Sequence, residues 1–169
     1  MRLIGLAGWS GAGKTTLLTR LIPCLQKQGI SVSTIKHAHH GFDIDVPGKD
    51  SWQHRQAGAG QVLVSSGKRW ALMTELRDAQ EPPLSFLLSR LSPVDLVIVE
   101  GFKRDAHPKI EVHRRLNGKP WLHPNDPAIL AMASDVAPPG GLPWVDMDNT
   151  EAVAELALRH AIEVPPWHS

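Results

Sequence analysis

Apolar and polar positions follow two different periods near the start of the chain. Residues 3–7 form a short apolar run, which favours a buried strand. Beyond it, apolar side chains recur at helical spacing at Leu17, Leu18, Leu21, Ile22 and Leu25. Gly29 then stands where a helix commonly ends. This pattern predicts a strand followed by a helix, with a glycine-rich stretch between them.

The rest of the chain predicts the same alternation of strands and helices. The further predicted strands are residues 30–36, 61–65, 69–74, 96–99, 110–113, 129–133 and 144–145. The further predicted helices begin at Ser51, at Pro82-Pro83 with Leu84, Leu87, Leu88 and Leu91, and after Asp148, ending near Ile162. Ser51 and an Asp148–Glu151 capping box are the expected helix caps. This order is typical of a three-layer α/β domain with a mostly parallel sheet.

The short turn at residues 66–68 predicts that its two flanking strands form an antiparallel hairpin, placed at the edge of the sheet. Residues 37–50 and 138–143 are expected to be irregular. One domain over residues 1–163 and a loose tail over 164–169 are predicted. Trp70 and Trp144 are expected to be core residues because they fall within strands.

Composition excludes several classes of protein. The chain has 169 residues, with 18 Lys and Arg against 17 Asp and Glu, so no global basic field favours nonspecific nucleic-acid binding. The single cysteine, Cys24, has no partner for an internal disulfide and is expected to lie in the core. No apolar run approaches the roughly 20 residues that span a bilayer. We therefore expect a cytoplasmic protein.

Residues 8–15 read Gly-Trp-Ser-Gly-Ala-Gly-Lys-Thr, a complete G-x-x-x-x-G-K-[ST] phosphate-binding motif. The glycines let backbone N–H groups point at a β-phosphate, Lys14 bridges β- and γ-phosphate oxygens, and the Thr15 hydroxyl is a Mg²⁺ ligand. A glycine-rich turn of another α/β fold is the alternative. The strand before the motif and the helix after it favour a triphosphate site. Its expected residues are Ser10, Gly11, Ala12, Gly13, Lys14, Thr15 and Thr16.

Two further strands end in residues that suit the same site, because ligands of such sheets lie outside the carboxyl ends of the strands. The strand at residues 96–99 ends in Glu100, which is expected to hold Mg²⁺ or orient a water, and Gly101, whose N–H is expected to approach a γ-phosphate. A plain strand-end charge is the alternative for Glu100. The strand at residues 129–133 ends in Ser134 and Asp135. A carboxylate there suits the N1–H and amine of guanine, although a turn-starting Asp would look the same.

A dense polar region follows the second strand. His37, His39 and His40 lie close together in the sequence, and imidazoles are good ligands for transition metals. No cysteine accompanies them, so a switch loop facing the γ-phosphate and Mg²⁺ is preferred, with Asp50 as a carboxylate near the metal. A solvated loop that contacts a partner is the other alternative.

Hydrolysis of a bound triphosphate is expected to be slow. Rapid cleavage needs a positioned water and an additional cation, often an arginine supplied by a partner. No residue identifies itself as that cation, and Lys103, Arg104 and Arg69 are candidates only.

Taken together, these motifs resemble the molybdopterin-guanine dinucleotide biosynthesis protein B family. The matching stretches are residues 9–18, 35–40, 47–51, 57–59, 69–75, 99–103 and 133–135. The resemblance implies a P-loop protein that binds GTP and Mg²⁺, hydrolyses GTP weakly, and assists guanylylation of molybdopterin by a separate nucleotidyltransferase. Molybdopterin itself is a further candidate ligand. The resemblance also implies a homodimer with the hairpin as its candidate pairing element, nucleotide binding by residues 11–16, and magnesium at Thr15 and Glu100.

Three other functions share some of these features. A small-molecule kinase shares the phosphate loop, although residues 103–115 contain no clear arginine-rich lid. A metal-delivery GTPase would use the His37/His39/His40 cluster. An adaptor would use the nucleotide only to stabilise a dimer.

Overall fold

The computed structural model describes residues 1–38, 41–102 and 105–164. The chain divides into two compact units. Residues 1–37 and 84–164 belong to the first unit, and residues 38–83 form the second. Within the described residues, no helix is long and apolar enough to cross a membrane.

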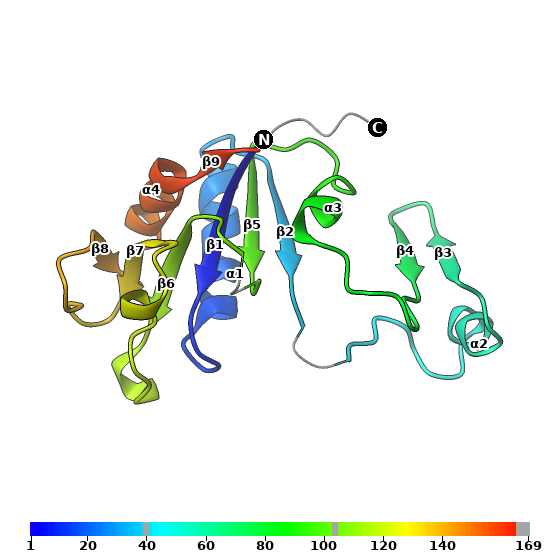
Figure 1. The fold of residues 1–169 in the computed structure, drawn as a ribbon. Coiled ribbons are helices and arrows are strands. Elements are labelled where there is room, and N and C mark those ends of the chain that lie inside the picture. Colours follow the sequence, from blue (N-terminus) through cyan, green and yellow to red (C-terminus); the bar gives the residue numbers. More distant parts are fainter. Residues whose placement is uncertain (39–40, 103–104, 165–169) are drawn as a thin grey trace. The chain divides into compact units, whose positions relative to one another are not determined.

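The first unit is built on a mostly parallel sheet (Figure 1). Its strands are β1 Arg2–Ala7, β2 Val32–Lys36, β5 Leu96–Glu100, β6 Lys109–His113, β7 Ile129–Ser134, β8 Trp144–Asp146 and β9 Ile162–Glu163. In the described chain the strand order is β2-β5-β1-β6-β7-β8, all parallel, and β9 pairs antiparallel with β1. The carboxyl ends of β2, β5, β1, β6 and β7 therefore meet at one edge of the sheet.

Helices cover both faces of this sheet, which confirms the three-layer P-loop NTPase fold (Figure 1). The helices α1 Lys14–Lys27 and α4 Thr150–His160 pack their apolar stripes against one face. The short α3 Leu84–Leu88 packs with Leu3, Val97 and Val99 of the other. β5 is apolar on both faces because both are covered, as expected of a central parallel strand.

The crossover from β6 to β7 contains no α-helix in the described chain, only the 3-10 turns η1 Arg115–Asn117 and η2 His123–Asn125. Ile110 and Val112 of β6 face α1 and α4. Lys109, Glu111 and His113 alternate with them and therefore lie on the opposite face of the sheet. All five residues of β6 are buried. Residues 105–126 therefore cover this face of the sheet, both by polar contacts and by packing of Trp121 and Leu122.

The second unit contains α2 Asp50–Gln56 and the antiparallel hairpin of β3 Gln61–Ser65 and β4 Trp70–Thr74. The predicted antiparallel pairing is confirmed, but its predicted place is wrong. β3 and β4 form a two-stranded sheet of their own in the described chain and do not join the edge of the parallel sheet. A short turn fixes only the pairing of the strands it joins, not the attachment of the hairpin to other strands.

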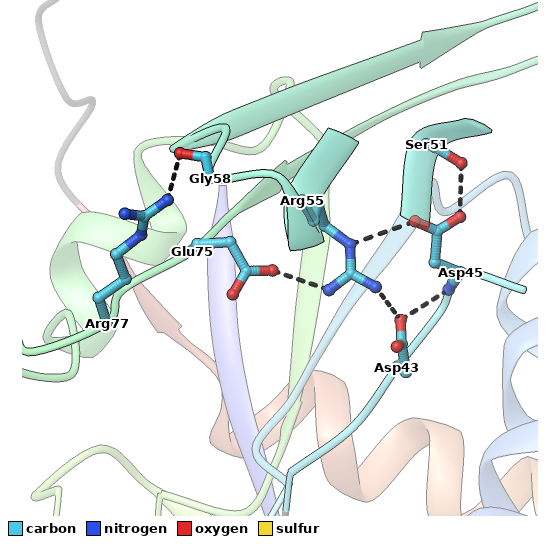
Figure 2. A network of polar contacts seen from close by, with 7 residues as sticks. All are labelled: Asp43, Asp45, Ser51, Arg55, Gly58, Glu75 and Arg77. Carbon is cyan, nitrogen blue, oxygen red and sulfur yellow. Dashed lines mark hydrogen bonds and ion pairs between the residues drawn. The ribbon is translucent and has the colours of Figure 1, made fainter. Parts of the chain in front are cut away.

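A charged cluster ties the parts of the second unit together (Figure 2). The Arg55 guanidinium donates to Asp45 at 3.2 Å, Glu75 at 2.7 Å and Asp43 at 2.7 Å. Its side chain is only 12% exposed. Hydrogen bonds to Arg55 and to the Asp45 N–H lower the pKa of Asp43. The cluster thus joins the loop before α2, the helix itself and the end of β4.

Two predicted caps are wrong. Lys49 precedes α2, and Ser51 lies inside the helix, where its hydroxyl donates to Asp45 at 2.6 Å. Asn149, not Asp148, caps α4 by accepting from the Ala152 N–H at 3.1 Å. The carboxylate of Asp148 instead accepts from Arg20 at 3.2 Å.

The tryptophan predictions are wrong as well, because Trp70 is 68% and Trp144 is 43% exposed. Cys24 packs partly buried against the core on the α1 side, as expected. Of the predicted tail, the Val164 N–H donates to Met1 O at 2.9 Å. Residues 165–169 lie outside the described residues.

Candidate functional site

The glycine-rich loop lies between β1 and α1, at the carboxyl edge of the sheet. Gly13 precedes α1 with φ of 92°, a left-handed conformation that favours glycine. A Cβ on Gly8 would lie 2.5 Å from Val112 O, so only glycine fits against β6 there. The Ala12 N–H closes the loop onto Trp9 O at 3.1 Å. Both ends of the loop therefore depend on glycine, as expected of a phosphate-binding motif.

The cationic and hydroxyl groups of the motif lie at the start of α1. Lys14 Nζ donates to Gly8 O at 2.9 Å and to Trp9 O at 3.1 Å, so its ammonium curls over the loop. Thr15 and Thr16 are exposed in the first helical turn. That turn contains no acidic residue, and no side chain caps it. The N-terminus of this 14-residue helix thus presents N–H groups and a positive dipole end to an anion.

Glu100 lies at the end of β5, half-buried and in register with Leu6 of β1. It is therefore at the same edge as the phosphate loop, as predicted. Gly101 follows with φ of 104°, and a Cβ there would lie 2.6 Å from the Cβ of His37. The His37 N–H donates to Glu100 O at 2.8 Å. Glycine at 101 thus lets the end of β2 approach Glu100.

The segment after β6 packs against the phosphate loop, which the sequence did not predict. Asn117 Nδ2 donates to Ser10 O at 3.1 Å, and the Trp9 indole N–H donates to Pro120 O at 2.8 Å. The Arg114 Nε lies 3.7 Å from where a Gly13 Cβ would be. Arg114 therefore supplies a cation beside the loop. The rule that ligands lie at strand carboxyl ends would have found it, had it been applied to β6.

Asp135 follows β7 at the predicted edge and is exposed. Its Oδ1 accepts from the Arg115 backbone N–H at 2.8 Å, so the carboxylate positions the start of η1.

Asp50 is exposed at the first position of α2, in the second unit. His39 and His40 of the predicted cluster, and the candidate cations Lys103 and Arg104, lie outside the described residues. Over residues 1–38, 41–102 and 105–164, no three His, Cys, Asp or Glu side chains gather to hold a metal ion. Arg69 lies in the turn between β3 and β4.

The polar row of β6 is a second feature that sequence reasoning missed. Glu111, 1% exposed, accepts from the backbone N–H groups of Leu122 at 2.7 Å and His123 at 2.9 Å. Lys109, also 1% exposed, donates to Asp126 at 3.0 Å. His113 stacks on Trp121 with ring centroids 3.6 Å apart. The alternation of polar and apolar residues in Lys-Ile-Glu-Val-His was the available signal.

Comparison with known proteins gives one family. A family model described as "Molybdopterin guanine dinucleotide synthesis protein B" matches residues 3–135. The "Molybdopterin-guanine dinucleotide biosynthesis adapter protein" of Escherichia coli (strain K12) is 45% identical over 92% of this chain and 91% of its own length. The protein of the same name from Haemophilus influenzae is 45% identical over 79% of this chain and 74% of its own length. The crystal structure of a "molybdopterin-guanine biosynthesis protein B (mobB)" has a TM-score of 0.74 and 31% identity, over 93% of this chain and 97% of that one.

Proposed function

Because this chain belongs to the molybdopterin guanine dinucleotide synthesis protein B family, we propose that it is a GTP-binding adapter protein. It assists the guanylylation of molybdopterin by a partner nucleotidyltransferase. The observation that supports this most is the phosphate loop, closed by its glycines against β6 and followed by the uncapped N-terminus of α1. The names of its relatives supply the pathway.

The residues of the loop bind the triphosphate of GTP. Backbone N–H groups from residues 10–16 point at the phosphates. Lys14 Nζ exchanges its present acceptors, Gly8 O and Trp9 O, for β- and γ-phosphate oxygens, and Arg114 lies close enough to Gly13 to add a second positive charge. These groups orient the phosphate chain along the sheet edge.

Thr15 and Glu100 suit a magnesium site. The Thr15 hydroxyl is exposed on the first turn of α1, and Glu100 ends the strand next to β1. Both offer the oxygen ligands that Mg²⁺ prefers. Bound Mg²⁺ would neutralise charge on the β- and γ-phosphates.

Asp135 selects guanine. One of its oxygens accepts the Arg115 N–H, which fixes the carboxylate at the end of β7, and the other is available to the guanine N1–H and amine. Adenine lacks these donors, and a hydrogen bond to a charged group contributes about 1.5–3 kcal/mol. The preference for GTP over ATP is therefore expected to depend on Asp135.

The isolated chain hydrolyses GTP slowly. Apart from Arg114, the described residues place no arginine at the loop that could serve as an arginine finger. Unassisted GTPases with comparable machinery turn over at about 10⁻²–10⁻⁴ s⁻¹. A turnover well above ~1 s⁻¹ without a partner would contradict this part of the proposal.

The protein acts as a homodimer paired through the hairpin. Leu63, Trp70 and Leu72 share one face of the hairpin and are 61%, 68% and 48% exposed. A two-stranded sheet is marginally stable alone, and both of its edges can accept a further strand. A second copy of the hairpin supplies the cover that this apolar face lacks.

Calorimetric titration with GTP and with ATP, each with and without Mg²⁺, tests the nucleotide site. Wild-type protein is expected to bind GTP more tightly than ATP, and more tightly with Mg²⁺. Lys14→Ala is expected to weaken GTP binding about ten- to hundredfold, from the roughly 1.5–3 kcal/mol of a charge-assisted hydrogen bond. Lys27→Ala, at the other end of α1, is the matched control and should bind like wild type.

Asp135→Asn is expected to reduce the ratio of GTP to ATP affinity while binding of the phosphates persists. An unchanged ratio would remove Asp135 from the base site. If wild-type protein binds neither nucleotide in magnesium buffer, the proposed function fails.

A further inference from the structure

A cleft of about 420 Å³ opens beside the carboxyl ends of β6 and β7. Its lining residues are His113, Arg115, Lys119, Trp121, Val136 and Ala137. Strand alternation places His113 on the sheet face opposite to that of Val112, which packs against the α1 side. The cleft is therefore on the other side of the sheet from the helix that carries the phosphate loop.

The lining combines flat aromatic surface with positive charge. The rings of His113 and Trp121 are stacked, with centroids 3.6 Å apart and planes 18° apart. Arg115 and Lys119 are exposed at the cleft, and among the described residues none of the lining side chains is acidic. A volume in this range suits a small molecule of roughly nucleotide size. We propose that this cleft binds a planar aromatic heterocycle that carries a phosphate group.

Each part of the cleft has a matching part in such a ligand. A flat ring gains from contact with an aromatic wall and with Val136. The Arg115 guanidinium suits a phosphate because its planar N–H groups pair with two oxygens, and Lys119 adds a point charge. An apolar ligand would leave both cations unused, and inorganic phosphate would leave the aromatic wall uncovered.

The walls are fixed by buried groups outside the cleft. The Glu111 carboxylate holds the backbone N–H groups of Leu122 and His123, directly after Trp121. Trp121 is also held from its edge by the His123 ring, at 5.7 Å and 67°. Rigid walls of this kind lower the entropy cost of binding.

The same segment links the cleft to the phosphate loop. The Trp9 indole N–H donates to Pro120 O between Lys119 and Trp121, and Asp135 holds the Arg115 N–H. The cleft thus shares a wall with the loop and adjoins Asp135, the residue that the proposed function assigns to guanine. Two ligands have the required chemistry, a guanine nucleotide and a pterin phosphate. The choice of a pterin as one of these ligands rests on the proposed function, whereas the description of the cleft itself does not.

Titrations of the full chain with 6-hydroxymethylpterin phosphate and with GMP test the proposal. The measurements are calorimetry for both ligands and pterin fluorescence for the first. The same titrations with phosphate-free 6-hydroxymethylpterin and with inorganic phosphate test each part of the ligand alone; these two are the part-ligands. Arg115→Ala/Lys119→Ala removes both cations from exposed positions and keeps the Arg115 backbone N–H. Lys27→Ala/Lys68→Ala, which removes two exposed cations elsewhere, is the matched control.

At least one phosphorylated heterocycle is expected to bind wild type more tightly than either part-ligand. The Arg115/Lys119 double variant should raise its Kd about tenfold or more, while the control, Lys14→Ala and Asp135→Asn should not. The heterocycle that meets these conditions shows whether the cleft takes a guanine nucleotide or a pterin phosphate. The proposal is overturned if neither binds at millimolar concentration, if inorganic phosphate binds equally well, or if the double variant and its control agree. It is also overturned if Lys14→Ala or Asp135→Asn abolishes binding.

The two proposals fail separately. Loss of GTP binding by wild-type protein would end the proposed function, whatever the cleft binds. A cleft without ligand would leave the GTP titration and its Lys14→Ala variant unaffected.

Discussion

His107 is a titratable side chain enclosed beside the central strand of the sheet. It is 8% exposed, and neither ring nitrogen meets a hydrogen-bond partner among the described residues. A Cβ on Gly5 would lie 2.5 Å from its Nε2, so the ring fits only over a glycine. Burial, together with the nearby Lys109 charge, lowers the pKa of His107, while Asp105 and Asp126 oppose this effect. The folded protein therefore favours the neutral imidazole.

This pKa shift predicts a loss of stability on the acid side. Below about pH 6.5 an unfolded histidine takes up a proton that the folded His107 resists, so falling pH favours unfolding until the folded-state pKa is reached. His107→Gln, which cannot titrate, should show a smaller fall in Tm between pH 7.5 and 5.5. Each kcal/mol corresponds to roughly 2–4 °C for a domain of this size.

Thermal melts followed by circular dichroism at both pH values provide the measurement. His54→Gln, at an exposed position in α2, is the matched control and should fall like wild type. Equal falls in all three proteins would show that His107 does not contribute to acid sensitivity.

At the residue scale, the sequence revealed those groups whose role depends on residues next to them in the chain. The phosphate loop could be recognised because its glycines, Lys14 and Thr15 are consecutive. The partners of Asp135 and Trp9 could not, since Arg115 and Pro120 reach them only through tertiary structure. Glu111 and Lys109 were missed because they are charged residues in a strand that folding buries with partners far along the chain.

At the element scale, the cap of α4 can be tested directly. Asn149 Oδ1 accepts from the Ala152 N–H at the start of the helix, so Asn149→Ala leaves that donor without its partner. The expected loss is about 1 kcal/mol in the free energy of unfolding, measured by denaturant melts. Asn149→Asp keeps an acceptor and is expected to be nearly neutral. If both variants were equally stable, the cap would contribute nothing.

The same element shows why cap predictions from sequence are imprecise. Asp148 and Asn149 are both good capping residues, and sequence alone cannot decide between neighbours that differ by one position. Arg20, on α1, binds Asp148, and that partner is visible only in the folded chain. The strands were easier, because β1 and β5 are short apolar runs that suit a buried parallel sheet. The two-residue β9 was missed because it is too short to show a period.

At the scale of the whole molecule, the sequence predicted the layers of the first unit but not that the hairpin forms a sheet of its own. The hairpin between α2 and α3 has the alternation of any half-buried strand pair, and no change in composition marks residues 38–83. These residues form a unit because they contact mainly one another, and one face of their hairpin is exposed. The wrong prediction for Trp70 has the same origin, since burial was inferred from its place in a strand.

The exposed face of the hairpin, which contains Leu63 and Leu72, allows a test of the oligomeric state. Leu63 and Leu72 face each other across β3 and β4, and in a homodimer paired through the hairpin both are buried. Leu63→Lys/Leu72→Lys would place two charges in that interface. The variant is expected to yield monomers in analytical ultracentrifugation, and wild type is expected to sediment as a dimer. Leu116→Lys, at a 93% exposed position in η1, is the control and should remain dimeric. In the proposed dimer the hairpin would gain a cover, so the double variant should also exchange the amide protons of β3 and β4 faster than wild type. A wild-type protein that sediments as a monomer at all concentrations would contradict pairing through the hairpin.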